Sequence, residues 1–141
     1  MKPLSPAQLR TLWVWLTRRY FPAWLNAVNW QVFLRPAGQW TDPSGMVHSK
    51  DEAGYCHQEK RRISINTSYI QQIRAIMIHE AVHASGCAYH GIEFCQKMLM
   101  VGDRAEKLGD AGLARAVRED VYTHPRGKVA EELLRNGHIM R

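Results

Sequence analysis

The sequence lacks three features that mark whole classes of protein: paired cysteines, long apolar runs and a secretory leader. Its three cysteines are an odd number and form no C-x-x-C pair, so reduced thiols are expected rather than a disulfide framework. No stretch reaches the roughly 20 apolar residues of a membrane-spanning helix. The apolar run at 12–16 is too short for a signal peptide and stands between arginines. We therefore expect a soluble, cytoplasmic protein without membrane contact.

Acidic residues are absent from the first 35 positions, which hold five basic residues and four tryptophans. A basic surface with aromatic side chains suits nucleic acid, because phosphates attract arginine and bases stack on rings. On this hypothesis Arg10, Arg18 and Arg19 contact DNA. The alternative is that most of the tryptophans belong to the core and the arginines to a solvated helix face.

Length and patterning indicate one α+β domain over residues 1–125, followed by a short helical extension at 126–141. Ser5, Pro6 and Gln8 predict the start of a helix that ends at Pro22. The remaining elements follow from periodicity, turn residues and caps. They are strands at 28–35, within 46–58 and at 61–66, in a small, mainly antiparallel sheet, and helices from Ser68, from Ile92 to about Val101, near 111–122 and at 128–136.

The motif His79-Glu80-x-x-His83 falls on the helix expected from Ser68. Residues four apart on a helix lie on one face, so His79 and His83 can bind one cation while Glu80 stands beside it. Gly86 can end the helix and let the chain double back, which makes His90 the natural third ligand. Three histidines suit a catalytic zinc ion, which keeps one position open for water. Glu80 then acts as the general base in amide hydrolysis.

The other histidines have simpler interpretations. His57 lies beside Cys56 but lacks a partner pair, so a surface loop is expected there. His48, His124 and His138 are expected to be ordinary surface residues. Glu93 suits the first turn of a helix because of the helix dipole, although it can also support a ligand histidine.

These motifs together resemble the SprT-like (Spartan-type) zinc metalloproteases. The likeness rests on His79-Glu80-x-x-His83, on His90-Gly91-x-Glu93-Phe94 with Met98, and on the strand 62–66 before the active helix, and it covers roughly 28–102. It implies a minimal zincin-like fold, zinc bound by His79, His83 and His90, and Glu80 in catalysis. It also implies that 61–66 offers its edge to an extended protein or peptide substrate, through Ile63, Ser64 and Ile65.

Two departures limit what this resemblance implies. The chain has no cysteine after Cys95, so it lacks the zinc ribbon of longer members, and a role on DNA-attached proteins is left open. Metzincin spacing fails because Tyr89 stands where the third histidine belongs. Two other classes also stay open: a nucleic-acid-binding module with a structural or vestigial zinc site, and a zinc amidohydrolase for a small substrate.

Overall fold

The computed structural model describes residues 4–123, and within them the fold is α+β, as expected. The chain forms two compact units, Met1–Glu80 and Ala81–Arg141, with the boundary inside the helix that carries the motif. The single domain expected over 1–125 stays a prediction, and the extension at 126–141 lies outside the described residues. None of the described helices is both long and apolar enough to cross a membrane.

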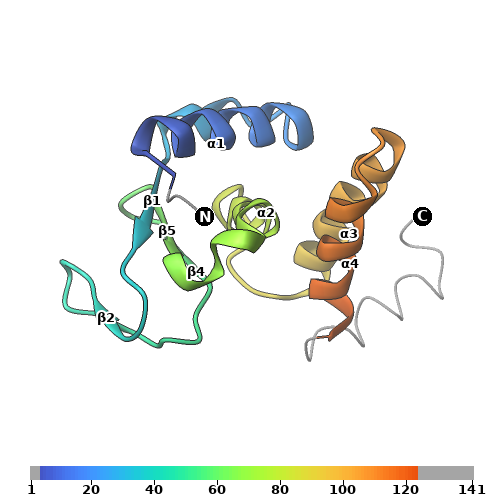
Figure 1. The fold of residues 1–141 in the computed structure, drawn as a ribbon. Helices are drawn as coiled ribbons and strands as arrows, with labels where there is room; N and C mark the ends of the chain where they lie inside the picture. Colours follow the sequence, from blue (N-terminus) through green and yellow to red (C-terminus); the bar gives the residue numbers. More distant parts are fainter. Residues whose placement is uncertain (1–3, 124–141) are drawn as a thin grey trace. The chain divides into compact units, whose positions relative to one another are not determined.

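The elements are labelled in Figure 1. In chain order they are the helix α1 (Pro6–Tyr20), the 3-10 helix η1 (Leu25–Asn29), the strands β1 (Gln31–Arg35), β2 (Trp40–Thr41), β3 (Val47–His48), β4 (Gly54–His57) and β5 (Arg62–Asn66), the 3-10 helix η2 (Thr67–Gln72), and the helices α2 (Ile73–Ala84), α3 (Ile92–Lys107) and α4 (Ala111–Thr123).

The first helix begins with the predicted capping box. The Ser5 hydroxyl accepts a hydrogen bond from the Gln8 backbone N–H at 3.1 Å, and the Gln8 side chain accepts one from the Ser5 N–H at 2.9 Å. Helix α1 packs against β1 (Figure 1), and its side chains Trp13 and Leu16 are buried. A fully buried leucine contributes roughly 1.5–3 kcal/mol, so this burial holds the helix on the sheet.

The main sheet has the strand order β1-β5-β4. The pairing of β5 with β4 is antiparallel, and so is that of the separate β2-β3 pair, whereas β5 runs parallel to β1. A parallel pair needs a long crossover, which the segment carrying β2, β3 and β4 supplies. Because β5 is paired on both sides, the expectation that 61–66 offers a free edge is wrong. The edges of this sheet are β1 and β4.

Arg35 holds the long connection after β1 in place by hydrogen bonds, and its side chain is almost fully buried. Its Nη1 donates to the carbonyls of Pro36 at 2.8 Å and Gly38 at 2.6 Å. Its Nη2 donates to those of Ser49 at 2.7 Å and Glu52 at 3.1 Å. One planar guanidinium therefore satisfies four loop carbonyls and fixes the route of the chain into β4.

The helix with the motif starts differently from the prediction. The Asn66 side chain, not that of Ser68, provides the cap: its oxygen accepts from the Ser68 N–H at 3.0 Å and opens η2. The Asn66 amide also donates to the carbonyls of Lys50 and Glu52, at 3.0 and 3.1 Å. The α-helical turns begin only at Ile73, because the chain first makes this 3-10 segment.

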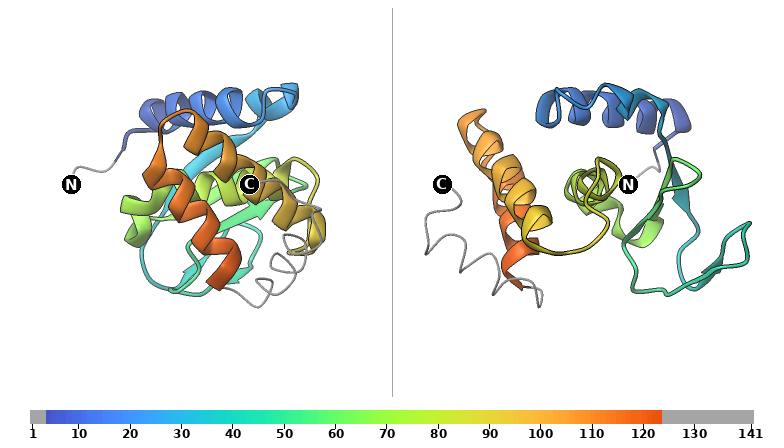
Figure 2. Two further views of the ribbon diagram at one scale, coloured as in Figure 1. Left: turned by 90° about the vertical axis from the view of Figure 1, so that its right-hand side faces the viewer. Right: turned by 180° about the vertical axis from the view of Figure 1, so that it is seen from behind.

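In the second unit α3 and α4 lie side by side as a helical hairpin (Figure 2). Phe94, Met98 and Val101 are buried on α3, as predicted. The helix expected to end at about Val101 continues through Gly102 to Lys107. A Cβ at Gly102 would lie 3.2 Å from Cγ of Arg118, so the glycine leaves room for that side chain of α4.

Candidate metal centre

Helix α2 carries the three motif residues His79, Glu80 and His83. Met77, Ile78, Ala81 and Val82 are almost fully buried, and they anchor the helix through its apolar face. The side chains that carry the chemistry differ in exposure, because His79 and His83 are half-buried whereas Glu80 is 5% exposed. The two imidazoles can therefore reach a ligand, whereas the Glu80 carboxylate is enclosed by the protein.

Gly86 ends the helix as predicted. Its φ of 129° is in the region that glycine adopts more readily than other residues, and its N–H bonds to the His83 carbonyl at 3.2 Å. The Cys87 N–H bonds to the Val82 carbonyl at 3.3 Å. The chain then turns back so that His90, which is exposed just before α3, comes close to His83.

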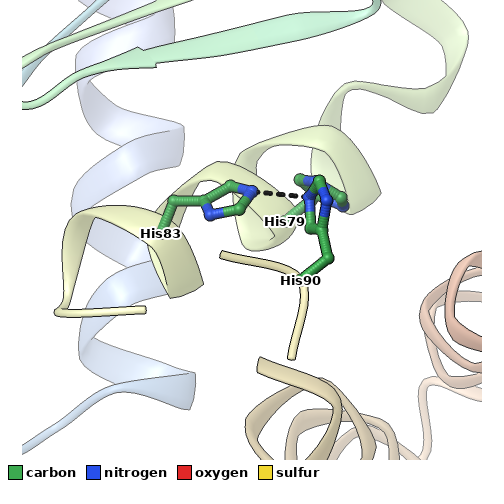
Figure 3. A group of neighbouring side chains, drawn as sticks. All are labelled: His79, His83 and His90. Carbon is green, nitrogen blue, oxygen red and sulfur yellow. Dashed lines mark hydrogen bonds between the residues drawn. The ribbon is translucent and has the colours of Figure 1, made fainter. Parts of the chain in front are cut away.

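The side chains of His79, His83 and His90 converge (Figure 3), and one ring nitrogen of each lies within 4.8 Å of the others. The Nε2 atoms of His83 and His90 are 2.9 Å apart. The ring of the fully buried Phe94 lies against both, with centroid distances of 4.7 and 4.8 Å. This group can hold a metal ion, and Phe94 fixes two of its three rings.

The tautomer of His83 is set by the loop after α2. Its Nδ1 lies 2.7 Å from the Cys87 carbonyl oxygen, which can only accept, so Nδ1 carries the proton. The Nε2 lone pair of neutral His83 then faces Nε2 of His90. A carbonyl that orients a ligand imidazole in this way is a common feature of metal sites. The donor set of three imidazole nitrogens fits zinc.

Glu80 lies against the backbone of β4. A Cβ built on Gly54 would be 2.9 Å from Oε2 of Glu80 and 2.8 Å from Cγ2 of Ile76, so only glycine leaves space for the carboxylate. Burial and then the Glu80 charge raise the pKa of the neighbouring Cys56 thiol to about 12. Cys56 therefore stays protonated at neutral pH and is not a nucleophile.

No family model, curated protein or solved structure matches this chain. The interpretation of the metal centre therefore rests on its own geometry.

The predicted substrate residues are not placed to contact a peptide. Ile63, Ser64 and Ile65 are each no more than 1% exposed, and they lie on the central strand of the sheet. Both faces of β5 are covered, since Ser64 is buried as well as Ile63 and Ile65. The edge strand near Glu80 is β4 instead.

The predicted DNA-contact residues have different surroundings. Arg10 donates to the carbonyls of Trp30 at 2.9 Å and Val28 at 2.5 Å, so it links α1 to the segment before β1. Arg18 is exposed, and the Arg19 guanidinium lies 5.1 Å from the ring centre of Trp15. Trp15 is the most exposed of the four tryptophans in this region, whereas Trp13 and Trp30 belong to the core.

Sequence reasoning missed a second group of donors formed by Asp42, His48 and His57. The expectation that His48 is a surface residue is wrong, since it is 1% exposed. His57 is half-buried in β4 rather than in a surface loop, and burial lowers the pKa of its imidazole. The turn residues at 42–45 were the available signal, because a hairpin there brings Asp42 next to His48. The predicted surface positions His124 and His138 lie outside the described residues.

Proposed function

We propose that the chain is a zinc-dependent endopeptidase of the SprT-like type. The observation that carries the proposal is the convergence of His79, His83 and His90. Glu80 follows His79 on the same helix and is buried. Structural zinc sites are normally closed by four protein ligands, whereas catalytic sites use three. Among residues 4–123, the group around α2 has three members, which favours the catalytic alternative.

Each residue of the centre has a distinct task in this proposal. His79, His83 and His90 would hold the metal, which when bound supplies a Lewis acid for the substrate carbonyl and for water. Glu80 accepts a proton from the attacking water at its carboxylate and returns it to the leaving amine. Cys87 orients His83 through its carbonyl oxygen. Gly54 leaves the space in which the Glu80 side chain is held.

The edge of β4 is the best place for a substrate. Among the described residues its only strand partner is β5, so the other edge of β4 can accept an extended peptide through main-chain hydrogen bonds. Gly54 in this strand lies against Glu80, which would bring such a peptide close to the general base. An open strand edge suits a polypeptide better than a small amide. The substrate site is therefore proposed at β4 in place of the expected 61–66.

The test is cleavage of an unfolded protein, reduced and alkylated casein, by the purified chain in the presence of enough zinc to saturate it. We expect internal cleavage, seen as new N-termini by mass spectrometry, that stops with a chelator and returns with zinc. Release of small amides without internal cleavage would favour the amidohydrolase. Stoichiometric zinc without any hydrolysis would favour the binding module.

Contact with nucleic acid is a second candidate, supported by the surroundings of Trp15. Its exposed ring is flanked by the guanidinium groups of Arg19 at 5.1 Å and Arg74 at 5.8 Å. Single-stranded DNA binds to such combinations by stacking and by charge. Binding to a fluorescent oligothymidylate should weaken steeply with salt, and Trp15→Ala should weaken it further. If the affinity did not change with salt, these arginines would be surface residues that pack around Trp15 without binding nucleic acid.

A further inference from the structure

A second group of metal-type donors lies within the first unit, apart from the motif on α2. Asp42 directly follows β2, His48 ends β3 and His57 ends β4. One donor atom of each lies within 4.8 Å of the others. Oδ2 of Asp42 is 2.8 Å from Nε2 of His48 and 3.9 Å from Nδ1 of His57. Side chains from the ends of β3 and β4 thus approach one carboxylate oxygen of the residue that follows β2.

The Asp42 carboxylate is oriented by its own turn. Oδ1 accepts hydrogen bonds from the backbone N–H groups of Ser44 at 2.8 Å and Met46 at 3.1 Å, and from the Ser44 hydroxyl at 2.5 Å. These three bonds occupy Oδ1 and direct Oδ2 toward the histidines.

The contacts of His48 require a cation or an extra proton. Nδ1 lies 2.8 Å from Oε1 of Glu52, and a carboxylate can only accept, so Nδ1 carries a proton. In the neutral ring the lone pair of Nε2 then faces Oδ2 of Asp42, which is also electron-rich. Either His48 is an imidazolium between two carboxylates, or Nε2 and Oδ2 share a metal ion.

His57 favours the metal ion. Its Nδ1 is 3.9 Å from Oδ2 of Asp42, which is too far for a hydrogen bond but near enough for one ion to lie between the two atoms. An imidazolium at His48 satisfies Asp42 and Glu52 but leaves His57 unexplained. A shared cation gives all three side chains a role.

We propose that Asp42, His48 and His57 form a second metal site, which binds zinc or a similar divalent ion. Two imidazoles and one carboxylate suit zinc, and Glu52 orients His48 as carboxylates commonly orient ligand histidines. The ion would join the β2-β3 pair to strand β4 through the side chain of His57. A pocket of about 410 Å³, lined by Asp42 and His57 among others, gives it access from solvent.

The site is tested by counting zinc per chain after dialysis, using mass spectrometry under native conditions. We expect two ions in the unaltered chain, and one in the double variant His79→Gln/His83→Gln, which leaves the second site intact. His57→Gln should also retain one ion, because the other site, formed by His79, His83 and His90, is intact. Glu59→Gln, which changes an exposed residue lining the same pocket, is the matched control and should retain two.

Thermal unfolding gives a readout that is independent of any catalysis. Zinc should raise the midpoint of the double variant His79→Gln/His83→Gln, and adding His57→Gln to that variant should abolish the shift. The proposal is overturned if the double variant binds no zinc and shows no shift. That result would indicate that His48 is an imidazolium between its two carboxylates. It would not count against the proposed peptidase, because the double variant already lacks two ligands of the peptidase metal centre.

Discussion

His83 donates from Nδ1 to the Cys87 carbonyl oxygen at 2.7 Å, which leaves its Nε2 facing Nε2 of His90 at 2.9 Å. The glycine that ends α2 makes this possible, because it turns the chain so that Cys87 and His90 return to the end of the helix. The carbonyl thus fixes both the tautomer and the direction of the ring before any metal binds.

Removing His90 should weaken zinc binding at this centre by more than the roughly 10–100-fold that loss of a ligand's orienting partner costs. His90→Ala takes away one of three ligands, so a competition titration with a chromogenic chelator should show the loss. Tyr89→Ala is the matched control, since Tyr89 is 86% exposed and adjacent. Equal zinc affinity in His90→Ala and Tyr89→Ala would remove His90 from the site.

Gly54→Ala should impair hydrolysis while zinc binding stays unchanged. The added methyl would meet Ile76 at 2.8 Å and the Glu80 carboxylate at 2.9 Å, so the general base must move. Overpacking of this kind costs about 1–3 kcal/mol, which urea unfolding can measure. Gly112→Ala in α4 is the control, because nothing lies within 4 Å of its added methyl. Unaltered kcat in Gly54→Ala would mean that the position of Glu80 is not critical.

Arg35→Lys should lower the free energy of unfolding by about 2–4 kcal/mol, because an ammonium cannot satisfy the four carbonyls that the guanidinium now reaches. Arg115→Lys on the exposed face of α4 is the matched control and should change stability little. Urea unfolding followed by tryptophan fluorescence measures both. A loss in Arg35→Lys as small as that in the control would contradict this role.

The α3-α4 hairpin should lose part of its stability in acid. Nη2 of Arg118 lies 2.5 Å from Asp103 and 3.2 Å from Glu106, and its hydrogen bond holds the pKa of Glu106 below the usual value of 4.5. The stabilisation is fully present above that usual value and is lost as the pH falls through the lower value of the folded state.

The difference in stability between the unaltered chain and Arg118→Gln should therefore be constant near pH 7 and shrink below about pH 4. Urea unfolding at a series of pH values measures this difference. If it stayed the same down to pH 2, the contribution of Arg118 would come from its packing over Gly102 rather than from charge.

The sequence predicted the parts of this structure that depend on local chemistry. The Ser5 capping box, the end of α2 at Gly86 and the three histidines that converge there all follow from residues a few positions apart. Helical geometry and turn preferences set such features with little influence from the rest of the chain.

The features that the sequence did not predict depend on pairing between distant segments. The central position of β5 follows from its parallel pairing with β1, which alternation alone cannot reveal. The contact between Asp42 and His48 depends on the register of β2 and β3. The approach of His57 to this pair depends on the path of the chain between β3 and β4, which Arg35 holds in place. The continuation of α3 past Val101 depends on a distant contact too, because Gly102 leaves space for the Arg118 side chain of α4.

The most direct test of the proposed peptidase compares the rate of casein cleavage by Glu80→Gln with that by Glu93→Gln. Both variants are measured at equal zinc occupancy of the site formed by the three histidines around α2. Glu80→Gln removes the proton acceptor but none of the three histidines, so it should keep its zinc and lose about 100- to 10,000-fold in kcat. Glu93→Gln changes an exposed carboxylate on α3 and should cleave at the unaltered rate. Cleavage by Glu80→Gln at the rate of Glu93→Gln would contradict the proposal.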